Sequence, residues 1–161
     1  MTGSKSPHFA TLAVHAGAVP DPATGARVTP IYQTTSFVFR DADHAANLFG
    51  LQEFGNIYTR IMNPTQAVLE ARVAALEGGS AALAVASGHA AQFLTFHKLL
   101  EPGDEFIAAR QLYGGSVNQF NHGFRKFDWR VVWADATKPE TFRAALTPKT
   151  RAIFIESIAN P

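Results

Sequence analysis

The amino-acid sequence predicts an α/β fold whose second half is a mainly parallel, doubly wound sheet. From about residue 63 onward, short apolar segments of strand length alternate with segments of helix length, which is the pattern of successive βαβ units. Several of the helix-length segments are bounded by capping residues, proline or glycine, so their starts and stops are defined. Residues 1–62 lack this periodicity and are rich in turn residues, which predicts an irregular N-terminal segment.

This irregular segment is interrupted throughout by proline and glycine. Residues 34–39 are expected to be extended, and residues 41–49 are expected to form a short helix opened by Asp41 or Asp43. A segment of this length with so little periodic structure buries little of its own surface. It is therefore expected to lie against another surface, such as that of a partner subunit.

A well-defined helix is predicted to begin at Asn63. Asn63 can cap the helix, Pro64 suits the first helical position, and Gln66 can bond back to the cap. Two glycines, Gly78 and Gly79, end it. Further strands are predicted over residues 81–86, 105–109, 130–134 and 151–155. Further helices are predicted over residues 89–100, 116–127 and 139–146. These elements complete the α/β alternation.

The composition excludes several classes of function. Hydrophobic residues make up 47% of the 161 residues and charged residues 17%, which is typical of a globular chain. A net charge of +1 is too balanced for binding to nucleic acid by counterion release. The absence of cysteine excludes disulfides, thiol nucleophiles and zinc–thiolate sites in this chain, and the scattered histidines predict no metal site. With no apolar leader and no run of membrane-spanning length, a cytoplasmic location without membrane partners is the expected default.

The first candidate ligand site is Ser87-Gly88-His89, between a predicted strand and the helix that follows it. In parallel sheets, ligands bind beyond the carboxyl ends of the strands. Gly88 allows close approach to the backbone, and the free N–H groups that open the helix favour an anion. The same residues also suit an ordinary strand-to-helix turn. The chain has neither a P-loop nor a Gly-x-Gly-x-x-Gly sequence after a strand, which disfavours nucleotide binding.

Two tyrosines are further candidates. Tyr113 follows the next strand and precedes two glycines, so its ring can cover a ligand and its phenol can transfer a proton. Tyr58 and Arg60 alternate, so in an extended chain both side chains point to one side, where a phenol and a guanidinium suit a phosphate. Each of these motifs also has a simpler interpretation when it is taken singly. Tyr113 could be an ordinary loop tyrosine at the edge of the core, and Arg60 could be a solvated arginine beside a packed Tyr58.

Four segments are more informative in combination. They are residues 58–65 (YTRIMNPT), 86–91 (ASGHAA), 112–116 (LYGGS) and 156–161 (ESIANP). In this order they resemble the Cys/Met-metabolism family of pyridoxal-phosphate (PLP) enzymes, and the resemblance extends over the chain from about residue 8. It implies an aspartate-aminotransferase-like large domain, with residues 63–161 as the first half of this PLP-binding domain. Residues 1–62 would then be an arm that reaches a neighbouring subunit.

The resemblance also implies roles for individual residues. The backbone amides of Gly88 and His89, with Ser87 beside them, would hold the phosphate of the cofactor. Tyr113 would stack on the pyridine ring, and its phenol would serve in proton transfer, which makes it the candidate catalytic residue. Asn160 would lie near the ring oxygen of the cofactor, with Glu156 close behind.

The remaining implied contacts cross between subunits. Tyr58 and Arg60 would reach the cofactor phosphate of a neighbouring copy, which requires a homo-oligomer, expected to be a homotetramer. This gives the irregular N-terminal segment a function.

Within the family, residues 54–65, His89 and the opening residues 15–17 and 30–36 look most like those of O-acetylhomoserine sulfhydrylases. The implied activity is PLP-dependent γ-replacement of the acetate of O-acetyl-L-homoserine by sulfide, which yields L-homocysteine for methionine and cysteine biosynthesis. Methionine γ-lyase, cystathionine γ-synthase and O-succinylhomoserine sulfhydrylase are the alternatives within the family. A non-catalytic assembly module is the alternative outside it.

The chain departs from the family pattern in one respect. Several functional residues of the family come after the position that corresponds to Pro161. They are the lysine that carries the cofactor, the Asp that pairs with the pyridinium, a Ser/Thr pair on the phosphate and the arginine that binds the substrate carboxylate. None of the five lysines here stands in a family-like Ser-x-x-Lys context. The chain is therefore expected to be the N-terminal part of the enzyme and inactive by itself.

Overall fold

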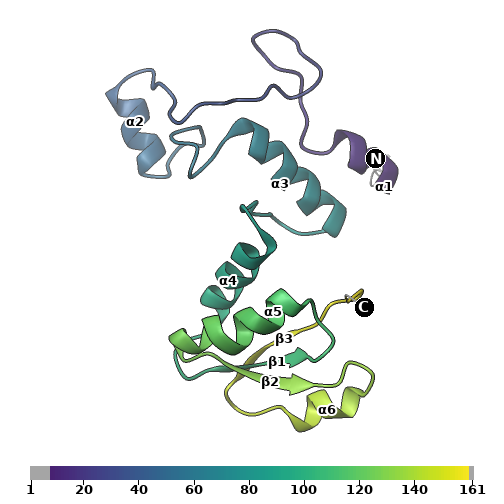
Figure 1. Cartoon of the computed structure of the whole chain (residues 1–161). Helices are drawn as coiled ribbons and strands as arrows, with labels where there is room; N and C mark the ends of the chain where they lie inside the picture. Colours follow the sequence, from purple (N-terminus) through teal and green to yellow (C-terminus); the bar gives the residue numbers. More distant parts are fainter. Residues whose placement is uncertain (1–7, 160–161) are drawn as a thin grey trace, which may run out of the picture. The chain divides into compact units, whose positions relative to one another are not determined.

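The structure is a computed structural model that describes residues 8–159. The chain forms two compact units, one up to Ala84 and one from Val85 onward (Figure 1). No helix between residues 8 and 159 is long and apolar enough to cross a membrane.

Within residues 8–84, the N-terminal unit contains three helices joined by long irregular segments. They are α1 (Phe9–His15), α2 (Ala42–Phe49) and α3 (Pro64–Glu77). Helix α1, which the sequence pattern did not predict, packs on α3. The chain leaves α1 through Gly17, which has a φ of +73° and lies so close to α3 that a Cβ there would meet the Ala71 Cβ at 2.8 Å. The predicted extended stretch forms an isolated antiparallel bridge between Ser36 and Tyr58.

The predicted caps of α2 and α3 are confirmed. The Asp41 carboxylate accepts a hydrogen bond from the His44 N–H at 2.7 Å and so opens α2. Asn63 is buried, and its Oδ1 accepts from the Thr65 N–H at 2.9 Å. Its Nδ2 also donates to the Tyr32 carbonyl at 2.8 Å, which fixes the preceding irregular chain to the start of α3. Gly78 ends α3 in the left-handed conformation, as glycine after a helix commonly does.

Two predictions about this region are wrong. Residues 81–86 form no strand, and Gln66 does not bond back to the cap of α3. A strand requires a ladder partner, and no described strand pairs with residues 81–86. Side chains of α3 bond the backbone of Ala84 instead. Its N–H donates to the Glu70 carboxylate at 2.8 Å, and its carbonyl accepts from Gln66 at 3.3 Å.

The second unit is a three-stranded parallel sheet with helices on both faces. Its strands are β1 (Glu105–Ala109), β2 (Arg130–Ala134) and β3 (Thr150–Phe154), in the order β2-β1-β3. Its helices are α4 (Gly88–Leu99), α5 (Gly114–Asn118), continued by a π-helical turn (Gln119–Gly123) and a 3₁₀ turn (Phe124–Phe127), and α6 (Pro139–Ala144). Each agrees with its predicted range to within two residues. The parallel α/β architecture is thus confirmed.

The strand order explains why helices lie on both faces of the sheet. The chain steps from β1 to β2 and then back past β1 to β3. Right-handed crossovers in opposite directions place their helices on opposite faces of a sheet. Figure 1 shows α5 and α6 on opposite sides of the strands.

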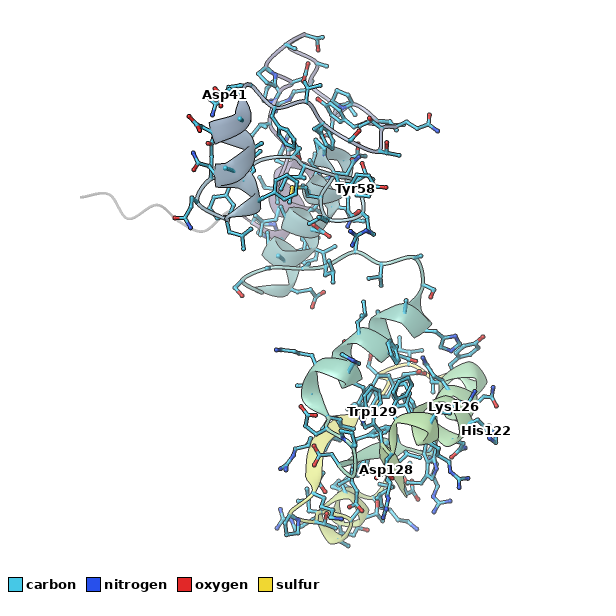
Figure 2. The ribbon with its side chains drawn as sticks, turned by 90° about the vertical axis from the view of Figure 1, so that its left-hand side faces the viewer. Asp41, Tyr58, His122, Lys126, Asp128 and Trp129 are labelled. Carbon is cyan, nitrogen blue, oxygen red and sulfur yellow. The ribbon has the colours of Figure 1, made fainter. Side chains whose placement is uncertain are left out.

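The core of this unit is aromatic. Phe106 on β1 is fully buried, and its ring centroid lies 4.3 Å from Phe96 of α4 and 5.0 Å from Phe120. Phe124 and Trp129, both buried, extend the cluster, with their ring centroids 5.3 Å apart in an edge-to-face arrangement. Trp129 is labelled in Figure 2. The same cluster includes Ala109 and Leu112, so it extends to the carboxyl end of β1, where the loop that carries Tyr113 begins.

Candidate functional site

Helix α4 begins with two free backbone donors. The Ser87 hydroxyl accepts from the Ala90 N–H at 3.1 Å, and the Ser87 carbonyl accepts from the Ala91 N–H at 3.0 Å. The N–H groups of Gly88 and His89 bond to no other described residue. No described atom lies within 4 Å of a Cβ built on Gly88, so the space beside these amides is open. A twelve-residue helix with two such donors favours an anion at its start.

The imidazole of His89 stacks on the ring of Tyr113. The two ring centroids are 5.9 Å apart and the planes differ by 26°. Tyr113 precedes α5, and its side chain is half exposed. The fold thereby brings together two of the predicted site residues, which are 24 positions apart. A flat aromatic surface stands next to the free amides of α4.

Gly115 makes room for this stacked pair. A Cβ at position 115 would collide with the Tyr113 ring and would lie 2.9 Å from two ring atoms of His89. Gly114 is different, because a Cβ there meets no atom of the described chain within 4 Å. Of the two adjacent glycines, the second is the one that the stack requires.

Two glutamine side chains link α4 to the helix that begins at α5. Gln119 Nε2 donates to the His89 carbonyl at 3.0 Å. Gln92 Nε2 donates to the hydroxyl of the buried Ser116 at 2.8 Å. The Oε1 atoms of both glutamines are buried and have no partner among residues 8–159. These bonds keep the first turn of α4 and the segment after Tyr113 in a fixed relation.

A carboxylate holds the backbone of Tyr113 from the other side. The Tyr113 N–H donates to Glu156 Oε2 at 3.0 Å. Glu156 follows β3 and Tyr113 follows β1, and these two strands are neighbours in the sheet. The sequence placed Glu156 near this edge without assigning it this contact.

Tyr58 and Arg60 lie together in the N-terminal unit, on which Tyr58 is labelled in Figure 2. The Arg60 guanidinium carbon lies 5.8 Å from the centroid of the Tyr58 ring, a cation–π arrangement. The expected extended conformation is wrong, because the chain turns after Tyr58, whose carbonyl accepts from the N–H groups of Ile61 and Met62. The turn, rather than strand alternation, pairs the two side chains.

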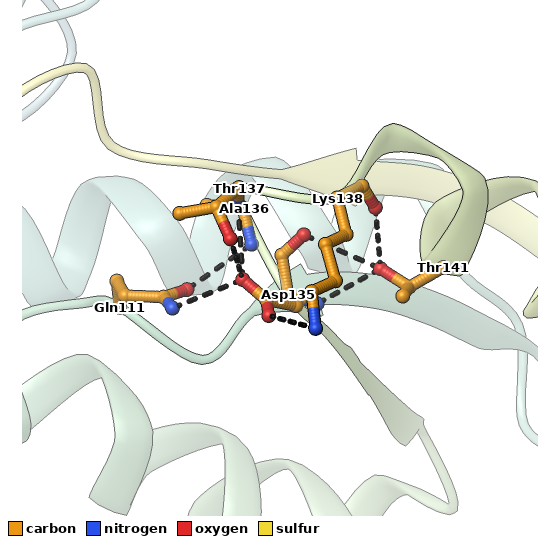
Figure 3. Close-up of polar contacts among 6 residues, drawn as sticks. All are labelled: Gln111, Asp135, Ala136, Thr137, Lys138 and Thr141. Carbon is orange, nitrogen blue, oxygen red and sulfur yellow. Dashed lines mark hydrogen bonds and ion pairs between the residues drawn. The ribbon is translucent and has the colours of Figure 1, made fainter.

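A further polar network occupies the carboxyl end of β2 (Figure 3). Asp135 accepts from the Thr137 hydroxyl at 2.7 Å and from Gln111 Nε2 at 3.3 Å, and it faces Lys138 Nζ at 3.9 Å. The Ala136 N–H in turn donates to Gln111 Oε1 at 3.1 Å. This network joins the loop after β1 to the loop after β2, and so anchors the β2 side of the loop that carries Tyr113.

The network makes a contribution to stability that depends on pH. The hydrogen bonds from Thr137, more than any other contact, lower the pKa of Asp135 below its ordinary value of 3.8. A carboxylate with a lowered pKa stabilises the fold above its unfolded pKa and loses that contribution as the pH falls through its folded pKa. We expect Asp135→Asn to lower the urea midpoint of the full-length protein by a constant amount above pH about 5. The difference from wild type should shrink below pH 3.8, and a difference independent of pH would contradict this account.

Four of the predicted site residues lie in the same unit. Ser87, Gly88, His89 and Tyr113 lie in one unit, around the start of α4 and the carboxyl end of β1. Asn160 lies outside the described residues. The residues that sequence reasoning missed are Gln92, Gly115 and Gln119. The only sequence signal for any of them is the Gly114-Gly115 pair, which does not distinguish the two glycines.

The arrangement fits a phosphorylated aromatic cofactor such as PLP. Two unbonded amides at a helix start with open space beside them suit a dianionic phosphate. The exposed face of the neighbouring Tyr113 ring suits a stacked heteroaromatic ring. The described residues supply the phosphate and ring-face contacts that such a group needs.

Comparisons with known proteins agree with this chemistry. The chain is 56% identical over 151 residues to the O-acetyl-L-homoserine sulfhydrylase of Leptospira meyeri. This match covers 94% of the chain and 34% of that protein. It is 54% identical to O-acetyl-L-homoserine sulfhydrylase 1 of Thermus thermophilus, covering 95% of the chain and 37% of the relative. The chain thus spans about a third of the length of the curated relatives it matches.

The structural comparison and the family comparison agree. A crystal structure of a candidate O-acetylhomoserine (thiol)-lyase from Campylobacter jejuni, which carries N'-pyridoxyl-lysine-5'-monophosphate, has a TM-score of 0.90 and 37% identity. The match covers 96% of this chain and 38% of that one. Residues 10–161 match the family model described as Cys/Met metabolism PLP-dependent enzyme. The chain therefore belongs to the Cys/Met metabolism family of PLP-dependent enzymes.

Proposed function

We propose that the full-length protein is a PLP-dependent O-acetylhomoserine sulfhydrylase. It would replace the acetate of O-acetyl-L-homoserine by sulfide and release L-homocysteine, a transferase reaction of methionine and cysteine biosynthesis. The observation that carries the proposal is the pair of free amides at Gly88 and His89, beside the ring of Tyr113 that stacks on His89. Two relatives with 54% and 56% identity bear the name of this activity.

In this proposal the start of α4 binds the phosphate of the cofactor. The Gly88 and His89 N–H groups donate to the phosphate oxygens, and Ser87 keeps the first turn in place by capping Ala90. The gap beside Gly88 leaves room for the phosphate to reach the amides. When bound, PLP supplies the electron sink for bond breaking at the amino acid substrate.

Tyr113 has two proposed roles. Its ring face covers the pyridine ring and orients it, with His89 supporting the opposite face of the tyrosine. Its phenol oxygen, carried by a half-exposed side chain, is free to accept and return a proton at the substrate. Asn160 is proposed to lie at the ring oxygen of the cofactor, by resemblance to the family.

Tyr58 and Arg60 are proposed to bind the cofactor phosphate of a neighbouring copy. Both side chains are exposed, and their pairing presents a phenol and a guanidinium on one surface. A guanidinium binds phosphate oxygens through two parallel hydrogen bonds. Residues 1–62 would then act as an arm between subunits of a homotetramer in the cytoplasm, and residues 63–161 as the first half of the PLP-binding domain.

The proposal is tested with purified full-length protein. We expect absorbance from bound PLP and formation of homocysteine from O-acetylhomoserine and sulfide. A parallel panel with cysteine as nucleophile, methionine as substrate and O-succinylhomoserine as ester separates the sulfhydrylase from the other family activities. Faster turnover of any of those three, or protein that neither binds PLP nor forms homocysteine, would refute the assignment.

A further inference from the structure

The ring of Tyr113 is placed by its backbone more than by burial. Its side chain is half exposed and stands outside the aromatic core, so packing alone does not hold it. Its carbonyl accepts from the N–H groups of Ser116 and Val117, which ties Tyr113 to α5. Its N–H donates to Glu156 at 3.0 Å. The carbonyl and the N–H of Tyr113 are therefore both hydrogen-bonded. The carbonyl is bonded by nearby residues, and the N–H is bonded by a residue 43 positions away.

Glu156 anchors the side of the loop that faces β3. On the side of β2, the loop after β1 is held by the Arg110 N–H on the Ala134 carbonyl at 2.8 Å and by Gln111 on Asp135 and Ala136. On the side of β3, the hydrogen bond from the Tyr113 N–H to Glu156 joins the loop after β1 to the segment that follows β3. The register of β1 and β3 brings both strand ends to one edge of the sheet, so a glutamate side chain spans the gap.

We infer that Glu156 is a positioning residue, which holds the Tyr113 ring at the proposed cofactor site by accepting the Tyr113 N–H. This inference rests on the proposed function for the role of the ring. Glu156 acts through Tyr113 and contributes an acceptor oxygen.

The test uses the full-length enzyme, three single variants at this position and its partner, and one double variant. We expect Glu156→Ala to weaken PLP binding to the apoprotein roughly tenfold and to change the circular dichroism of the bound cofactor. Glu156→Gln, which keeps an acceptor oxygen at the same reach, should stay within about twofold of wild type. In a Tyr113→Ala background, Glu156→Ala should add no further loss, since two residues that act as one unit are not additive.

A cofactor-free measurement separates this inference from the proposed function. In the apoprotein, trypsin should cleave after Arg110 faster in Glu156→Ala than in wild type or Glu156→Gln, because the loop loses its anchor. Glu140→Ala serves as the matched control, because Glu140 is exposed on α6 and makes no hydrogen bond or ion pair within residues 8–159.

Each failure has a distinct result. Independent, multiplicative losses from Glu156→Ala and Tyr113→Ala would overturn the inference, as would equal cleavage rates at Arg110. Loss of PLP binding in Glu156→Gln as severe as in Glu156→Ala would also overturn it, because the charge rather than the acceptor would then matter. Failure of the wild-type protein to bind PLP would instead overturn the proposed function and leave the cleavage experiment to decide the role of Glu156.

Discussion

Replacing Gly115 with alanine is expected to weaken PLP binding by the full-length enzyme roughly tenfold to a hundredfold, while leaving the fold intact. The new methyl group would collide with the Tyr113 ring and stand 2.9 Å from two atoms of the His89 imidazole. Both rings would have to move, and in the proposed site they are the surface against which the cofactor ring lies. The substitution does not destabilise helix α5, because alanine has a higher helix propensity than glycine.

The neighbouring glycine provides the matched control. A methyl group at Gly114 meets no atom within 4 Å in the described chain, so Gly114→Ala should bind PLP like wild type. The measurement is the dissociation constant of PLP from each apoprotein, with the thermal midpoint of each variant as a check on folding. Equal affinities for Gly115→Ala and Gly114→Ala would show that the stacked pair does not set the cofactor surface.

Local patterns were sufficient to predict most of the elements. Strands β1 and β2 coincide with their predicted ranges, because short apolar runs bounded by turn residues carry their own signal. The starts of α2 and α3 were predictable because a cap depends on residues two or three positions away. Residues 81–86 carried an equally apolar signal and yet form no strand, because a strand depends on a partner that periodicity does not reveal.

The same distinction applies to the candidate site. Ser87-Gly88-His89 could be recognised from the sequence, because the turn and the helix start are formed by adjacent residues. The contacts of Tyr113 with His89 and with Glu156 span 24 and 43 positions, and they follow from the order of the strands. The need for Gly115 follows in turn from the stack, so it could not be read before the stack was known.

Phe106→Ala is expected to lower the free energy of unfolding of the second unit by about 3–5 kcal/mol. Phe106 is fully buried on the central strand, and its ring lies between Phe96, Phe120 and Phe124 at centroid distances of 4.3, 5.0 and 5.8 Å. Deleting the phenyl group removes buried apolar surface and leaves a cavity that three rings cannot easily close. Because the loop that carries Tyr113 emerges from the same strand, the loss should also appear as weaker retention of PLP.

Phe127→Ala removes the same phenyl group from the edge of this core and is the matched control. The Phe127 side chain is 42% exposed and contacts Trp129 with a ring-centroid distance of 4.8 Å, so less surface is lost to water and the gap can fill with solvent. Its cost should be less than about half that of Phe106→Ala. The comparison is made by urea unfolding of the full-length proteins without PLP, since bound cofactor would add its own stabilisation. Equal midpoints for the two variants would mean that the aromatic core below the strand ends is not the main source of stability in this unit.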